Sequence, residues 1–194
     1  MLYAVENRRS IREYIRDDVP VAAIEEIVRA GMLAPSSKNR QPWKFIVTGG
    51  KEKESFLSAM FAGMEREKVQ PLLPGSAGYL KGAENTLRIM GQAPVLILVV
   101  NTLGLDVCAA ASPEERIFEI CNAQSIGAAV QNMTLTATQM GLGSLWICDT
   151  YFAYRELCDW AGGDLTAVMA VGYAQESPRP RPRKDMAEAV EWRL

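Results

Sequence analysis

The chain has 194 residues, of which 48% are hydrophobic and 23% charged, so it can bury a core like an ordinary globular protein. Its formal net charge of -2 argues against a nucleic-acid-binding protein, which needs a basic excess. The sequence contains no histidine, which excludes a Ser-His-Asp triad. Any chemistry therefore has to come from a cofactor, carboxylates or thiols.

Three arginines and a serine lie within five residues near the start, in the sequence Arg8-Arg-Ser-Ile-Arg12. In an extended segment Arg8, Ser10 and Arg12 share one face. Guanidinium and hydroxyl donors suit phosphate oxygens, so one interpretation is an anion site. The alternative is a solvated basic loop in front of a helix, and the other motifs have to decide between the two.

The hydrophobic pattern predicts helices alternating with strands. Helices are expected at 2–7, 21–33 (beginning after Asp17-Asp18), 51–68, 79–90, 120–140 and 151–160. Strands are expected at 45–48, 94–100, in the stretch ending at 147, and at 165–173. This order indicates an α/β or α+β sandwich. With neither a repeat nor a dividing linker, the expectation is one domain over 1–194, with 177–194 as a C-terminal arm.

Two parts of this pattern remain open. The prolines and glycines of 71–78 break the helical pattern, and 60–90 is a candidate lid or substrate region. No charged residue occurs from Ile120 to Cys148, but its amides and hydroxyls would be costly in a bilayer. We therefore expect a long helix buried at the centre of a domain or of a dimer, and no membrane partner.

The loop Pro35–Trp43 carries hydroxyls and amides between prolines. Such a loop is usually a surface connector. The rigid prolines at both ends indicate instead a loop held in one shape for a function.

The four cysteines have apolar neighbours and no CxxC spacing, so we expect small buried thiols rather than a disulfide frame or a metal site. The charged residues near the start leave no apolar signal region. Both points favour a cytoplasmic protein. Trp43 and Trp146 are expected in the core, and Asn85 and Arg88 on a helix surface.

Taken together, five motifs resemble those of the FMN-dependent nitroreductase family. They are Arg8-Arg-Ser-Ile-Arg-Glu-Tyr, Ala34-Pro-Ser-Ser-Lys-Asn-Arg-Gln-Pro-Trp-Lys-Phe, Ala93-Pro before a strand, Gly141-Leu-Gly-Ser-Leu-Trp-Ile, and Gly172-Tyr-Ala followed by Pro, Arg and Lys. The resemblance implies an α+β sandwich with a mixed or antiparallel central sheet. It also implies an intertwined homodimer with FMN at the subunit interface.

The resemblance also implies roles for particular residues. Arg8 and Ser10, beside Arg9, would hold the FMN phosphate, and Arg12 would reach the pyrimidine edge of the flavin. Arg181 or Arg183, with Lys184 nearby, would close on the phosphate. Two further sets would line the flavin: Pro35, Ser36, Ser37, Asn39 and Gln41 from the opposite subunit, and the backbone amides around Leu142, Gly143 and Ser144.

The activity that the resemblance implies is a ping-pong oxidoreductase. NAD(P)H would reduce the flavin at N5 and leave, and a nitroaromatic or quinone acceptor would take its place. Arg12 would stabilise the negative charge that gathers on the reduced flavin, an effect typically worth ~3 kcal/mol. The catalytic set is then Arg12, Gly143 and Ser144, with no metal. The alternatives are a specialised member (a dehalogenase, ene-reductase or flavin-modifying enzyme) or a flavin-binding protein without turnover.

Overall fold

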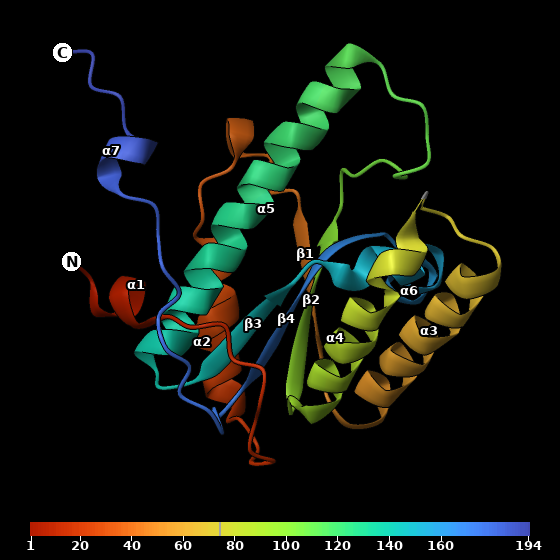
Figure 1. Ribbon diagram of the computed structural model, residues 1–194, viewed down its shortest axis with the longest axis horizontal. Helices are drawn as coiled ribbons and strands as arrows, with labels where there is room; N and C mark the ends of the chain where they lie inside the picture. The colour runs from red at the N-terminus through yellow and green to blue at the C-terminus, as the bar shows by residue number, and fades with distance from the viewer. Residues whose placement is uncertain (74) are drawn as a thin grey trace.

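A computed structural model gives the structure of the protein and describes residues 1–73 and 75–194. Its centre is a four-stranded antiparallel sheet in the order β1-β2-β4-β3. The strands are β1 (Trp43–Thr48), β2 (Val95–Asn101), β3 (Gly143–Ile147) and β4 (Asp164–Gly172). Helices cover both faces of this sheet (Figure 1), which confirms the predicted α+β sandwich with an antiparallel sheet.

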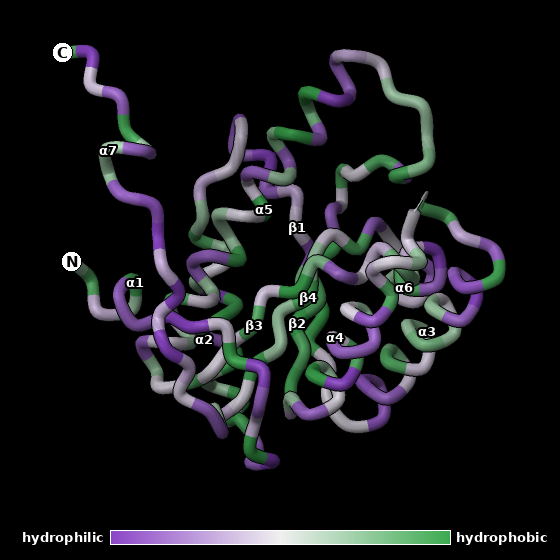
Figure 2. The backbone as a smooth tube through the Cα atoms, in the orientation of Figure 1, coloured by the Kyte–Doolittle hydropathy of each residue, from purple (hydrophilic) through white to green (hydrophobic). Residues whose placement is uncertain are grey.

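Strand β2 explains why the run from Pro94 to Val100 is continuously apolar. Leu96 and Leu98 belong to the hydrophobic cluster on one face of the sheet, while Ile97 and Val99 belong to clusters on the other. All four side chains are fully buried. Figure 2 shows the same arrangement as hydrophobic strands at the centre of the molecule.

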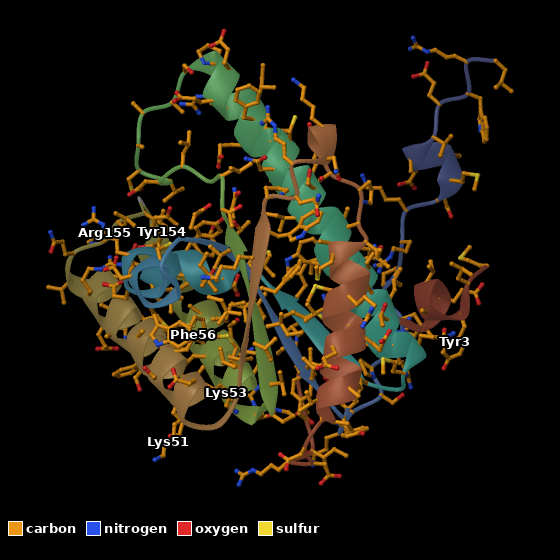
Figure 3. The ribbon with its side chains drawn as sticks, turned by 180° about the vertical axis from the view of Figure 1, so that it is seen from behind. Tyr3, Lys51, Lys53, Phe56, Tyr154 and Arg155 are labelled. Atoms are coloured by element: carbon orange, nitrogen blue, oxygen red, sulfur yellow. The ribbon has the colours of Figure 1, made fainter. Side chains whose placement is uncertain are left out.

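The helices form one layer on each side of the sheet. One layer is α2 (Val21–Met32) with α5 (Pro113–Gln139), and the other is α3 (Gly50–Val69), α4 (Leu80–Gln92) and α6 (Tyr154–Ala161). The short elements are α1 (Tyr3–Asn7), η1 (Ser37–Asn39), η2 (Ser76–Tyr79), η3 (Asp149–Ala153) and α7 (Met186–Ala189). Figure 3 shows Phe56 of α3 and Tyr154 of α6 within one layer, and Tyr3 of α1 on the opposite side of the molecule.

Helix α5 is longer than the sequence pattern predicts, because it begins at Pro113 rather than near 120. Its start is a capping box: the Ser112 hydroxyl accepts from the Glu115 amide at 3.3 Å, and the Ser112 amide donates to the Glu115 carboxylate at 2.8 Å. In the single chain only one face of α5 is buried, while Ile117, Phe118 and Ile120 are exposed. Of the two expected places for this helix, the centre of a domain or of a dimer, one chain alone leaves part of α5 uncovered, and burial in a dimer stays a prediction.

Helix α2 forms where it is predicted, but its start differs. Its N-cap is Pro20, and its first turn carries no acidic residue, so Asp17 and Asp18 do not cap it. The predicted break at 71–78 is confirmed for its described residues, and Pro74 lies outside them. The segment 60–90 packs as α3 and α4 against the core on the α6 side of the sheet. Its role toward a substrate, and the single-domain assignment, stay predictions.

Two expectations about burial are wrong. Cys108 and Cys148 are exposed and Cys121 and Cys158 only partly buried, and all four are free thiols. Trp146, on the edge strand β3, is 40% exposed. Asn85 and Arg88 do lie on the surface of α4, where they bond to each other.

Glu67 anchors the chain that leaves α3. Its buried carboxylate accepts from the amides of Leu72 at 2.8 Å and Leu73 at 3.0 Å and pairs with Arg66. The Arg66 guanidinium also donates two hydrogen bonds to the Glu156 carboxylate of α6, at 2.9 and 3.1 Å. Burial alone would raise the pKa of Glu67, but the two amide donors and Arg66 outweigh it and hold that pKa below its usual value of 4.5.

Glu67→Ala is expected to lower the free energy of unfolding by about 3 kcal/mol at neutral pH, because it leaves amides without an acceptor and Arg66 with one partner fewer. Since the folded-state pKa of Glu67 is lowered, its stabilisation is present above pH 4.5 and is lost as the pH falls through the folded-state value. Urea unfolding across this range measures the difference between wild type and variant. The exposed Glu84→Ala is the control, and a Glu67→Ala deficit that persists undiminished in acid would contradict the assignment.

Candidate functional site

The two ends of the chain meet at a pocket of about 270 Å³. It is lined by Val5, Glu6, Arg8, Arg9, Ser10, Arg12, Pro178, Arg179, Pro180, Arg181 and Arg183. We call it the arginine pocket. In Figure 1 the red N-terminal segment and the blue C-terminal segment run side by side next to α1. Residues more than 160 positions apart therefore form one site.

Backbone pairing holds these two segments together. The Ile15 amide donates to the Tyr173 carbonyl at 3.0 Å, and the Gln175 amide donates to the Glu13 carbonyl at 2.9 Å. The N-terminal segment also lies along the edge strand, because the Ile11 amide donates to the Ser144 carbonyl at 3.0 Å. The close approach needs a glycine in β3, since a Cβ at Gly143 would meet Ile11 at 2.9 Å.

The arginine pocket carries a concentrated positive charge. Six guanidinium groups line it against one carboxylate, that of Glu6. Within the part of the chain that the structure describes, none of the six forms an ion pair within 4 Å. Burial, then Arg183, then Arg9 lower the pKa of Arg8. Cations crowded in this way favour binding of an anion between them.

The arginines are not equivalent. Arg9 donates to the carbonyls of Glu6 at 2.7 Å and Arg8 at 2.9 Å, so its guanidinium closes the end of α1. Arg12 donates to the Ser10 carbonyl at 3.0 Å, which stiffens the predicted phosphate segment. Arg183 lies near enough to lower the pKa of Arg8. This favours the register of the C-terminal arm in which Arg183, of the two candidates Arg181 and Arg183, lies next to Arg8.

The arginine pocket thus brings together six of the predicted residues: Arg8, Arg9, Ser10, Arg12, Arg181 and Arg183. Sequence reasoning missed Arg179, although the alternation of proline and arginine from 178 to 183 contains it. Lys184, predicted nearby, is outside the lining. The binding roles of all these residues stay predictions.

The turn from Gly141 to Ser144 lies beside this segment, but its first predicted amide is occupied. The Leu142 amide donates to the Ala137 carbonyl at 2.8 Å, closing the end of α5, and the Leu142 side chain is buried in the core. In one chain the Leu142 amide is thus already hydrogen-bonded, and the predicted role of the amides around Leu142, Gly143 and Ser144 at the flavin stays a prediction. The Ser144 hydroxyl is buried and, among the described residues, has no hydrogen-bond partner.

The loop after α2 is held in one shape, as its prolines indicate. Lys38, Asn39 and Gln41 have φ values of 52°, 54° and 49°, in the left-handed region that such residues rarely adopt. Each left-handed residue costs on the order of 1–3 kcal/mol and persists only where its surroundings fix it.

Helix α5 and the loop itself supply this fixation. The Ser37 amide donates to the Ser125 hydroxyl at 3.1 Å, and the Gln41 amide donates to the Ser36 hydroxyl at 3.0 Å. The Arg40 guanidinium lies 4.5 Å from the centre of the Phe118 ring. The loop and α5 line a groove of about 290 Å³, which includes Pro35, Ser36 and Ser37.

This groove and the arginine pocket are separate in one chain. They share no lining residue. In Figure 1 the loop lies against the N-terminal half of α5, whereas α1 and the two terminal segments, whose residues line the arginine pocket, lie near its C-terminal end. A single chain therefore does not bring Asn39 or Gln41, the other predicted residues of this loop, to the arginine pocket.

The fold and these two regions define an α+β sandwich with an arginine-lined pocket beside its edge strand. A family model described as "Nitroreductase family" matches residues 5–173, and the chain belongs to this family, which confirms the resemblance. No helix among the described residues is long and apolar enough to span a bilayer.

Individual relatives agree with this assignment. A "Putative NADH dehydrogenase/NAD(P)H nitroreductase" of Methanothermobacter thermautotrophicus is 30% identical over 187 residues, covering 93% of this chain and 81% of that protein. A crystal structure of a "putative nitroreductase in complex with fmn" from Desulfovibrio desulfuricans is 26% identical, covers 98% of this chain and 95% of its own, and has a TM-score of 0.71. The "Iodotyrosine dehalogenase 1 homolog" of Caenorhabditis elegans is 27% identical over 139 residues, 66% of this chain and 42% of that protein.

Proposed function

We propose that this protein is an FMN-dependent NAD(P)H oxidoreductase that reduces small acceptors of the nitroaromatic or quinone type and works as a homodimer. The observation that carries the proposal is the convergence of six arginines from both chain ends on one pocket beside the edge strand. Membership of the nitroreductase family and a relative solved with FMN support it. The cytoplasmic location predicted from the sequence stays a prediction.

The residues of the arginine pocket fit a phosphate monoester. Such a group carries about -1.5 to -2 charges at neutral pH and accepts several strong hydrogen bonds. Arg8 and Arg183, whose charges repel each other, would both gain from an anion between them. The buried Ser144 hydroxyl would gain a partner from a ligand placed beside the Ser10–Ser144 bridge.

Each residue then has a distinct task. Arg8, Ser10 and Arg183 would hold the phosphate, and Arg12, fixed by its bond to the Ser10 carbonyl, would face the flavin and stabilise negative charge on it. Bound FMN would supply the transfer of hydride from NAD(P)H to the acceptor. The chain has no histidine, and solvent or the substrates would supply the protons.

The homodimer part of the proposal is supported by the separation of the groove from the arginine pocket. The loop of Pro35 to Gln41 is strained and braced by α5, as expected of a segment shaped for a ligand. In the dimer this loop would come from the second copy and complete the flavin site. The exposed apolar residues Ile117, Phe118 and Ile120 of α5 offer surface for that contact.

A second candidate activity is reductive dehalogenation, which the similarity to the iodotyrosine dehalogenase homolog favours. It would use the same flavin site and differ in the acceptor. A flavin-binding protein without turnover is the third possibility.

Anaerobic titration of the purified protein separates these candidates. We expect a yellow protein whose flavin absorbance is bleached by NADH or NADPH and restored by a nitroaromatic or a quinone. Restoration by a halogenated phenol alone would favour the dehalogenase. A flavin that neither nucleotide bleaches would overturn the proposed oxidoreductase.

A further inference from the structure

Glu176 is a carboxylate beside a site that is otherwise built for an anion. One of its carboxylate oxygens accepts a hydrogen bond from the backbone amide of Arg12. A fixed negative charge at this place opposes the binding of a phosphate and weakens the field of a neighbouring cation. The Glu176 carboxylate is therefore expected to contribute something else to the site that offsets this unfavourable charge.

The position of Glu176 in the paired segments indicates what it contributes. Pairing between the two chain ends runs through the Tyr14–Ala174 bridge and the bond from Gln175 to Glu13. Pro178, Pro180 and Pro182 follow directly, and proline has no amide to continue the pairing. Among the hydrogen bonds of the described residues, none beyond Glu176 ties the arm of residues 177–183 to the N-terminal segment.

Glu176 and Arg12 also act electrostatically on a common neighbour. Burial raises the pKa of the Tyr14 phenol, the Glu176 carboxylate raises it further, and Arg12 opposes both. The Tyr14 hydroxyl is buried and donates to the Ile11 carbonyl at 2.9 Å, within the same arginine segment. Glu176 and Arg12 therefore both lie close enough to Tyr14 for their opposite charges to act on it.

We propose that Glu176 is a positioning residue of the flavin site that acts through Arg12. Its hydrogen bond fixes the Arg12 backbone to the residue directly before the C-terminal arm and so holds the two halves of the arginine pocket together. Its charge moderates the field that Arg12 exerts on the bound flavin. This inference rests on the proposed FMN function and adds a residue to it.

Two substitutions separate the hydrogen bond from the charge. Glu176→Ala removes both, and we expect the dissociation constant for FMN to rise roughly tenfold, because a hydrogen bond to a charged group is lost. Glu176→Gln keeps an acceptor without the charge, so FMN affinity should stay within about twofold of wild type. The midpoint potential of its bound flavin should shift to a more positive value, because Arg12 is no longer opposed. The control is Gln175→Ala, since the bond made by Gln175 comes from its backbone.

Several results would overturn the inference. They are wild-type FMN affinity in Glu176→Ala, equal losses in both Glu176 variants, and an unshifted or more negative potential in Glu176→Gln. Hydrogen exchange of FMN-free protein gives a readout independent of the cofactor: the Arg12 amide should exchange faster in Glu176→Ala than in Gln175→Ala. If wild type binds no FMN, the proposed function fails, while this exchange measurement still decides whether Glu176 holds the segment.

Discussion

Arg8→Ala is expected to weaken FMN binding about thirtyfold, which corresponds to about 2 kcal/mol, while the rate of flavin reduction at saturating FMN changes little. The guanidinium of Arg8 faces the arginine pocket from the N-terminal segment, and Arg183 faces it from the arm. In the proposed site, removing Arg8 would take away a donor to the phosphate and leave the groups near the flavin in place. Fluorescence titration of FMN-free protein with FMN measures this change.

The same variant should be at least as stable as wild type without FMN. Burial and the nearby Arg183 and Arg9 lower the pKa of Arg8, so its charged form is disfavoured in the folded protein and its removal relieves repulsion. Arg16→Ala, at an exposed arginine outside the arginine pocket, is the matched control and should leave FMN affinity unchanged. Equal affinity of Arg8→Ala and wild type for FMN would remove Arg8 from the site.

Arg12→Ala is expected to slow flavin reduction by NAD(P)H about 100-fold, because the loss of a fixed cation aimed at developing charge typically costs ~3 kcal/mol. Its effect on FMN affinity should be smaller than that of Arg8→Ala. Stopped-flow reduction with FMN held saturating separates the rate from the affinity.

Arg12→Lys tests whether charge or geometry matters at this position. Lysine keeps the charge but lacks the planar fork that bonds to the Ser10 carbonyl, so we expect partial recovery of the rate. If Arg12→Ala lowers FMN affinity as much as Arg8→Ala does and leaves the reduction rate unchanged, the division of roles between the two arginines is wrong.

The sequence predicts the sheet and most of the helices because their signals are local. The uninterrupted apolar residues of β2 indicate a strand buried on both faces, and the structure places Leu96 and Ile97 in separate clusters on those faces. The start of α5 could also have been predicted, since Ser112-Pro-Glu-Glu115 is a capping box in plain sequence. The exposure of Trp146 could not have been predicted in this way, because it depends on the sheet order that puts β3 at an edge.

The candidate site depends on contacts between residues far apart in the sequence, which local patterns do not reveal. Arg8 and Arg12 are conspicuous because they are crowded in sequence, but Arg179 and Glu176 gain their meaning only from the pairing of residues 12–15 with residues 173–176. The hydrogen bond from the Leu142 amide to the Ala137 carbonyl at the end of α5 likewise forms only on folding. Motif resemblance indicates which residue types gather, whereas hydrogen-bond geometry shows which donors remain available.

The most direct measurement is size-exclusion chromatography of the purified protein with light scattering and flavin absorbance recorded on the same peak. Each chain holds the arginine pocket at one place and the strained loop at another, so the proposed flavin site would need two copies of the chain to form. We expect a mass of twice the 21.4 kDa chain with one FMN per chain. A single-chain mass, whether colourless after addition of FMN or fully loaded with it, would contradict a flavin site shared between two copies.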